Sequence, residues 1–308
     1  MRYPALLLAL TLSATLCSQD LHYHESGGFG TDGTYGVSGS VYRVTNLNNE
    51  GEGSLRSGIE MSDPRLIVFE VGGIIDLEEQ NLVIENASVT IAGQTAPYPG
   101  ITLIKGGFRV KEGDVLIQHL TLRPGDGSYD EAMGWEPDGF ATSSTKVVFD
   151  HCSVSWAVDE NMSVARGGNE VSFSRCIIAE GLSNSIHAKG EHSCGLLIAP
   201  DTKKISSIGS LYAHNFRRNP RLADHDYITI LVESSVMPEG FQVYDAYENI
   251  ELVLKNAGAR PRERSEVDIL KLIPLPVQSS SKPISLNRAT MNSALIWVNI
   301  IYQMVSMY

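Results

Sequence analysis

The segments KVVFDHCSVSWAVDE, residues 146–160, and EVSFSRCIIAEGL, residues 170–182, share one pattern. Each is rich in β-branched residues with partial alternation and carries a cysteine in its middle. Cys152 and Cys176 are 24 residues apart in these matching contexts. Such alternation predicts strands, and its recurrence at a fixed spacing predicts stacked units. We therefore expect the two cysteines to be inward-facing neighbours on adjacent units.

The same pattern extends in both directions, in RLIVFEVGG (65–73), ASVTIAGQT (87–95), DVLIQHLTLRPGD (114–126) and KISSIGSLYAHNF (204–216). The spacing is 22 residues from Val71 to Gly93, 26 from Gly93 to His119, and 24 from His151 to Arg175. No helical segment of any length lies between these strands. A period in the low twenties without helices predicts an all-β parallel β-helix, a solenoid whose coils bury an inward row of side chains. The alternative is a β-sandwich, which needs turn signals every 8–12 residues or so and hairpin dipeptides flanked by alternating residues, and the sequence has no such flanked dipeptides.

The two ends of the chain differ from this repeat. Arg2 and the apolar run ALLLALTLSATLC (5–17) predict a signal peptide over residues 1–18, and hence a secreted protein. Residues 19–244 form the predicted β-helix, which begins with a glycine- and serine-rich loop over 19–40. Residues 245–272 have helical spacing and predict a C-terminal helical segment. Residues 273–308 form an atypical tail, which we do not expect to insert stably into a membrane.

The formal net charge of the 308-residue chain is −12, which argues against a nucleic-acid partner because phosphate binding needs a basic surface. Removal of residues 1–18 would leave three cysteines, Cys152, Cys176 and Cys194. An odd number in an exported protein means at least one free thiol or an intermolecular bond. We expect a monomer.

Carboxylates gather in one region of the predicted solenoid. The loop PGDGSYDEAMGWEPDGF (124–140) contains five acidic residues, and Asp159 and Glu160 follow about one coil later. In coils of this length, Asp138 and Asp159 fall near the same face of adjacent turns. Clustered carboxylates suit Ca²⁺, a hard cation that prefers oxygen ligands, although solvated surface acids are the common alternative.

A basic cluster follows, in which HNFRRNPRLA (214–223) places three arginines within five residues. His187 and Lys189 precede it. Arginine binds carboxylates through two parallel hydrogen bonds, so a cationic cluster beside an acidic metal loop predicts a polyanionic substrate with carboxylates. In an extended segment neighbouring side chains alternate, so Arg217 is expected to point away from the face that presents Arg218.

Taken together and in order, these motifs resemble the pectate lyase family, whose fold is a right-handed parallel β-helix. The resemblance covers residues 26–226, with a second patch over 247–268. It is carried by YRVTNLNNEGEGSLR (42–56), IVFEVGGIIDL (67–77), TIAGQTAP (90–97), LRPGD (122–126), FDHCSVSWAVDEN (149–161), HAKGEHSCG (187–195) and RNPRLA (218–223). Relatives have further coils after the last motif, so an internal deletion is expected here.

The resemblance implies Ca²⁺-dependent β-elimination on polygalacturonate. It implies that Arg218 takes the proton and that Lys189 binds the substrate carboxylate, and Arg221 and His187 complete the substrate-binding residues. The calcium aspartates fall on Asp138 and Asp159. The usual third aspartate falls on Ser155, and the usual last basic residue falls on Ala223.

These departures leave three points open. Arg221 would replace the basic residue missing at Ala223, and Glu160 or Asp126 would complete the calcium site. A β-helix glycoside hydrolase is one alternative function, because the acidic loop supplies the two carboxylates that such enzymes need. A non-catalytic carbohydrate-binding protein is the other, because the deletion after residue 226 would remove coils that support Arg218.

Overall fold

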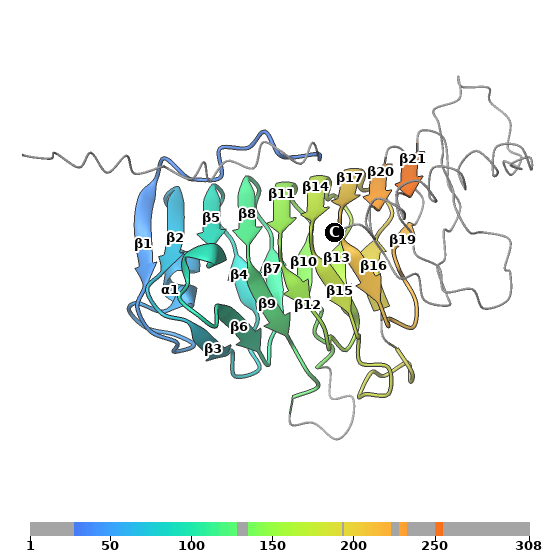
Figure 1. Cartoon of the computed structure of the whole chain (residues 1–308), viewed down its shortest axis with the longest axis horizontal. Coiled ribbons are helices and arrows are strands. Elements are labelled where there is room, and N and C mark those ends of the chain that lie inside the picture. Colours follow the sequence, from blue (N-terminus) through green and yellow to red (C-terminus); the bar gives the residue numbers. More distant parts are fainter. Residues whose placement is uncertain (1–27, 128–134, 193, 223–227, 233–249, 255–308) are drawn as a thin grey trace, which may run out of the picture.

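Three parallel sheets wind into a β-helix in the computed structural model, which describes residues 28–127, 135–192, 194–222, 228–232 and 250–254 (Figure 1). In spatial order the first sheet contains β1 (Ser40–Val44), β2 (Arg65–Phe69), β5 (Val89–Ala92), β8 (Val115–Gln118), β11 (Thr145–Asp150), β14 (Asn169–Ser174) and β17 (Lys203–Ile208). The second contains β3 (Gly73–Asp76), β6 (Ile101–Ile104), β9 (Leu120–Arg123), β12 (Ser153–Val154), β15 (Ile177–Ala179) and β18 (Leu211–Ala213). The third contains β4 (Leu82–Ile84), β7 (Phe108–Val110), β10 (Phe140–Thr142), β13 (Glu160–Val164), β16 (Cys194–Ile198) and β19 (Arg221–Leu222). The predicted parallel β-helix is thus confirmed.

The core is built from identical positions on successive coils. Val115 pairs in register with Val147, which pairs with Val171, so one inward position of the first sheet carries valine on three coils. The rings of Phe149 and Phe173 stack with centroids 5.4 Å apart and planes 3° apart. Cys152 and Cys176 are buried free thiols in the same core, as the sequence predicts for inward neighbours.

The short helix α1 (Leu55–Glu60) packs on the first coil. Ser54 caps its N-terminus, because its side chain accepts a hydrogen bond from the Ser57 backbone N–H. Leu55 and Ile59 turn inward and are fully buried. A 3₁₀ turn, η1, covers Gly93–Thr95.

From β8 onward, the turns between the first and second sheets are very short. His119, His151 and Arg175 occupy equivalent positions there, with φ of 53°, 52° and 51°. Their left-handed backbone turns the chain sharply within one or two residues. The imidazole rings of His119 and His151 stack with centroids 4.6 Å apart. These are the residues whose spacing reveals the period in the sequence.

Long connections occur only between the second and third sheets in the described coils that follow β9. The intervening segments are 124–139, 155–159, 180–193 and 214–220, of which residues 128–134 and 193 are not described. We call this edge of the solenoid the loop corner. All the residues that the sequence analysis selects as site residues lie in these segments or in the strands that follow them.

Two strands lie beyond β17. β20 (Ile228–Val232) lies beside β17, and β21 (Ile250–Leu254) pairs in parallel with β20, with Ile228 opposite Ile250 (Figure 1). This offset of 22 residues matches one coil. The helix predicted over 245–272 is therefore wrong at residues 250–254, where the β-branched and alternating IELVL continues the stack.

Other predictions fall outside the described residues. These are the signal peptide over 1–18, the tail over 273–308, and the remainder of the predicted helix on either side of β21. Residues 28–39 are turns and irregular chain, as predicted for the N-terminal loop. No helix in the described part of the chain has the length and apolar character needed to cross a bilayer.

Candidate active site at the loop corner

Backbone pairing in and beside the third sheet brings the predicted site residues together. Gly139 N donates to Glu160 O, and Glu160 pairs in register with Cys194. Cys194 in turn forms an isolated bridge with Arg217. Asp138, Glu160, Cys194 and Arg217 thus mark four successive coils. This stacking explains why residues up to 80 positions apart converge at the loop corner.

Asp138 forms the acidic end of this cluster. Its Oδ1 accepts a hydrogen bond from Glu160 N at 3.2 Å, and its Oδ2 accepts one from Ser163 Oγ at 3.1 Å. Burial raises the pKa of Asp138 to about 6, and repulsion from Asp159 adds to the shift. The hydrogen bond from Ser163 and the charges of Arg109 and Arg218 oppose this shift without cancelling it.

Arg218 supplies positive charge to the same cluster. Its Nη1 contacts Glu160 Oε1 and lies 3.7 Å from Asp159 Oδ1. Burial lowers the pKa of the Arg218 guanidinium and Arg221 adds to this shift, while Asp159 and Asp138 oppose it. The φ of Arg218 is 60°, a left-handed conformation that is costly for a non-glycine residue. The same left-handed φ recurs at turns of this β-helix, as at His151 and Arg175, so at Arg218 it marks a turn of the chain.

Two histidines complete the surroundings of Asp159. The rings of His187 and His192 stack with centroids 3.8 Å apart. His192 Nε2 lies 2.7 Å from Asp159 Oδ1, and His187 Nε2 lies 3.7 Å from the same oxygen. Lys189 N donates to His187 Nδ1 at 3.0 Å, so this nitrogen carries no proton and the neutral ring is protonated at Nε2. Both histidines are buried.

The remaining predicted residues lie at different depths. Lys189 is exposed to solvent, so its ammonium group is accessible to a ligand at the surface. Arg221 is half-buried on β19, opposite Leu197. Of the residues considered for the calcium site, Asp126 accepts a hydrogen bond from Ser185 Oγ at 3.3 Å. Ser155 is buried.

The prediction for Arg217 is wrong. Arg217 Nη2 lies 3.3 Å from His192 Nδ1, and its guanidinium lies over the ring of Phe216 at 5.6 Å. Arg217 and Arg218 therefore both reach the cluster around Asp159, one through His192 and one directly. Strict alternation fails because Arg218 has a left-handed φ and is not in extended backbone.

Buried asparagines support the segment that carries the arginines. Asn161 Nδ2 donates to Asn215 Oδ1 and to Ala179 O, at 2.9 and 3.0 Å. Asn215 Nδ2 donates to Asn219 Oδ1 at 2.9 Å. All three asparagines are buried. The sequence analysis missed this network. Asn215 and Asn219 flank Arg217 and Arg218, and the hydrogen bonds of their side-chain amides fix the backbone of the two arginines.

His192 and Cys194 were also missed as site residues. Both lie in HAKGEHSCG (187–195), where the paired histidines and the cysteine gave a signal that was read only as part of a basic motif. Cys194 is a buried free thiol. Burial raises its pKa to about 12, although Arg217 acts in the opposite direction.

The carboxylates present fit a hard cation. Asp138, Asp159 and Glu160 offer oxygen donors, the ligands that Ca²⁺ prefers. The pKa of Asp138 is raised by burial and, to a smaller extent, by the charge of Asp159, and a bound cation would stabilise the charged form of both carboxylates. The contact of Arg218 with Glu160 neutralises one carboxylate. Asp138 and Asp159 are therefore the better candidates for a calcium site.

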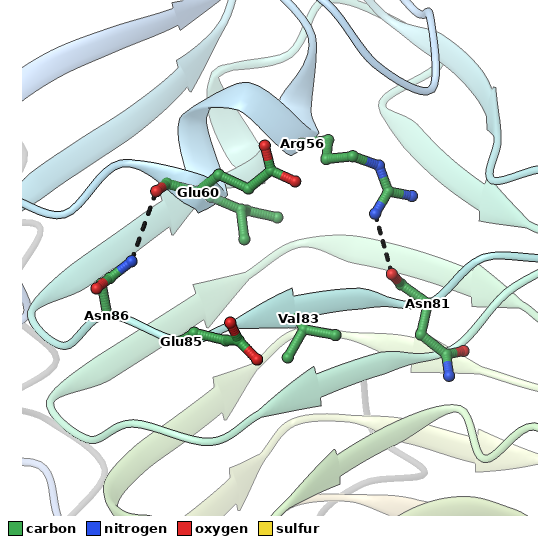
Figure 2. A pocket seen from close by; sticks show the side chains of 7 residues that line it. Arg56, Glu60, Asn81, Val83, Glu85 and Asn86 are labelled. Carbon is green, nitrogen blue, oxygen red and sulfur yellow. Dashed lines mark hydrogen bonds between the residues drawn. The ribbon is translucent and has the colours of Figure 1, made fainter.

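A separate surface pocket of about 240 Å³ lies between α1 and β4, away from these residues (Figure 2). Arg56 Nη1 donates to Asn81 O at 3.0 Å at one side of it, and Asn86 Nδ2 lies 3.5 Å from Glu60 O at the other. None of the predicted site residues lines this pocket. It belongs to the first coils, whereas the acidic and basic cluster belongs to later ones.

The fold and this cluster define a parallel β-helix protein with acidic, basic and histidine side chains at one loop corner. The sequence is 36% identical over 220 residues to "Probable pectate lyase C" of Neosartorya fischeri, a match that covers 70% of this chain and 48% of that protein. The chain thus spans about half the length of the curated relatives it matches. No protein-family model matches it. The resemblance inferred from the motifs is confirmed, and the chain is related to the pectate lyase family.

Two solved structures are also similar. The crystal structure of Jun a 1, the major allergen from cedar pollen, has a TM-score of 0.46 and 16% identity, covering 88% of this chain and 91% of that chain. Pectate lyase Bsp165PelA from Bacillus sp. N165, solved in complex with trigalacturonate, has a TM-score of 0.45 and 10% identity, covering 86% of this chain and 96% of that chain.

The raised pKa of Asp138 predicts how stability depends on pH when no metal is present. Its folded-state pKa of about 6 exceeds the ordinary value of 3.8, so the folded protein holds this proton more tightly than the unfolded chain does. The free energy of unfolding should therefore fall as pH rises from about 4 to 6, by roughly 1–3 kcal/mol. Urea denaturation in chelator, compared with Asp138→Asn, measures this. Parallel pH curves for the two proteins would contradict the assignment.

Proposed function

We propose that this protein is a polysaccharide lyase that cleaves polygalacturonate by Ca²⁺-dependent β-elimination. The observation that carries the proposal is the approach of Arg218 to Asp159 and Glu160 beside Asp138, at the corner where the loops are long. The relationship to proteins named probable pectate lyase C supports the substrate class. Polygalacturonate is a polymer too large to enter a cell intact, which is consistent with the export predicted from residues 5–17.

The proposed reaction begins with removal of the proton at C5 of a uronate, next to its carboxylate, and continues with breakage of the C4–O bond. Arg218 is the proposed base, and the lowering of its pKa by burial favours this role. Arginine is ordinarily always protonated, so the local environment is essential. Lys189, exposed at the rim, and Arg221 would pair with substrate carboxylates as negative charge develops.

Asp138 and Asp159 are the proposed calcium ligands, with Glu160 available if Arg218 moves away from it. When bound there, Ca²⁺ would act as a Lewis acid on the substrate carboxylate. Neighbouring side chains set the orientation of these two carboxylates, because Ser163 donates a hydrogen bond to Asp138 and His192 lies against Asp159.

Calcium binding gives a direct prediction for these ligands. Asp159→Ala or Asp138→Ala should weaken Ca²⁺ binding by more than about tenfold, since each removes a carboxylate from the cation. The matched control is Asp201→Ala, which removes an aspartate whose side chain is 73% exposed and which forms an exposed ion pair with Arg166. Calorimetric titration measures all three, with circular dichroism to check the fold. Equal Ca²⁺ affinities would refute the proposed ligands.

A glycoside hydrolase is the second candidate, and one observation favours it. Burial raises the pKa of Asp138 to about 6 beside the carboxyl group of Asp159, and a carboxyl group with a raised pKa next to a second carboxyl group suits the acid and base pair of hydrolysis. The products distinguish the reactions. Elimination yields an unsaturated uronate end that absorbs ultraviolet light and requires Ca²⁺, whereas hydrolysis yields only new reducing ends. A protein that binds polygalacturonate and forms neither product would be a non-catalytic binding protein.

A further inference from the structure

Four side chains at the loop corner form a group with a chemistry distinct from that of a calcium site. Asp159, Glu160, His192 and Cys194 each place one nitrogen, oxygen or sulfur atom within 4.8 Å of all the others. Glu160, His192 and Cys194 are buried, with 3%, 1% and 0% of their surface exposed. The backbone accounts for this convergence, since Glu160 and Cys194 are register partners on β13 and β16.

The polar atoms of this group are poorly satisfied by hydrogen bonds. Asp159 Oδ1, Glu160 Oε1 and His192 Nε2 are buried and form no hydrogen bond. Their contacts are ion pairs, of His192 with Asp159 and of Arg218 with both carboxylates. His192 Nε2 and Asp159 Oδ1 are 2.7 Å apart, so these two potential ligands already lie together. Burying such atoms without hydrogen bonds is costly. Nitrogen, oxygen and sulfur atoms gathered this closely, with few hydrogen bonds, are positioned to share one ion.

We propose that Asp159, Glu160, His192 and Cys194 bind a divalent transition-metal ion of the Zn²⁺ type. Imidazole nitrogen, thiolate sulfur and carboxylate oxygen are the ligands that Zn²⁺ uses. Ca²⁺ does not prefer nitrogen or sulfur, so this set discriminates between the two ions. Because Asp159 and Glu160 also belong to the proposed active site, the ion would compete with Ca²⁺ and act as an inhibitor.

Two features set the conditions for binding. Ligands of a tetrahedral zinc site lie about 3.3–3.8 Å apart for bonds of about 2.0–2.3 Å, so the side chains must close in by roughly 1 Å. Arg218 must leave Glu160, which it contacts in this structure. The Cys194 thiol releases its proton to solvent when sulfur binds the metal. Displacement of Arg218 supplies the inhibition, since the proposed base would lose its position.

Co²⁺ is the probe that tests the site, because it substitutes for Zn²⁺ and reports sulfur ligation by absorbance. Titration of the full chain should give a thiolate-to-cobalt charge-transfer band, saturating at about one ion per chain, and Zn²⁺ should abolish it. Cys194→Ser should lose the band and His192→Gln should weaken binding by roughly tenfold or more. Absence of the band in the folded wild-type protein would overturn the proposal.

Matched controls separate this site from other cysteines and histidines. Cys152→Ser changes another buried free thiol, and His151→Gln changes a histidine of the short turns, so both should keep the band. A band that persists in Cys194→Ser and disappears in Cys152→Ser would also overturn the proposal. The spectral result does not depend on lyase activity. Inhibition of Ca²⁺-dependent elimination by stoichiometric Zn²⁺, lost in Cys194→Ser, is the separate readout that rests on the proposed function.

Discussion

Replacement of Arg218 by lysine is expected to lower the rate of elimination by about 10²–10⁴-fold, the usual contribution of a positioned acid or base. Lysine keeps a positive charge but loses the planar guanidinium that reaches both Glu160 and Asp159. Substrate binding should remain largely intact, because the charge near the substrate is preserved. The effect should therefore fall on kcat, with little change in KM. Appearance of the unsaturated product measures it.

Two other arginines provide controls for this experiment. Arg217→Lys should lower the rate by less than about tenfold, because it weakens one hydrogen bond, to His192, worth about 1 kcal/mol. Arg166→Lys should leave the rate unchanged, since Arg166 forms an exposed ion pair with Asp201. Equal losses in the Arg217 and Arg218 variants would mean that Arg218 is not the base.

Replacement of Phe149 by alanine should lower the free energy of unfolding by about 3–5 kcal/mol. Phe149 is fully buried, and its ring lies 5.2 Å from that of Phe140 and 5.4 Å from that of Phe173. Removing it leaves a cavity shared by neighbouring coils, and a solenoid depends on contacts between neighbours for its stability. Urea denaturation followed by circular dichroism measures the loss.

Phe216→Ala is the matched control for this stability measurement. The Phe216 side chain is 51% exposed in the segment that precedes the arginines, so its removal should cost less than about 1 kcal/mol. Similar losses for the two variants would show that the stacked rings do not form the stabilising core, whereas a difference of several kcal/mol supports the register of the coils.

The repeat could be predicted from sequence because the turn residues and inward cysteines recur at nearly constant spacing. His119, His151 and Arg175 mark one turn on three coils, and Cys152 and Cys176 mark one core position. The strand over 250–254 could not be separated from a helix, because a short apolar run fits both periods. Pairing with residues 228–232 selects the strand. That pairing is a long-range contact, which the local sequence pattern does not reveal.

The candidate site was predictable where charge was unusual and was missed where it was not. Asp138, Asp159, Glu160 and Arg218 stand out as clustered charges, and the structure brings them together. His192 and Cys194 do not stand out in the sequence. They are recognised as site residues only once the strand register places Cys194 beside Glu160. The side chain of Arg217 was misplaced because the left-handed φ of Arg218 cannot be deduced from residue type.

At the loop corner, the length of the loops is independent of the pairing of the strands. The insertions over 124–139, 155–159, 180–193 and 214–220 all leave the stack after the second sheet and rejoin it at the third, so their lengths change without shifting the pairing of any strand. These segments can therefore differ in length while the stacked rows of valine and phenylalanine stay in place, as long as the buried contacts between loops, such as those of Asn215, are kept.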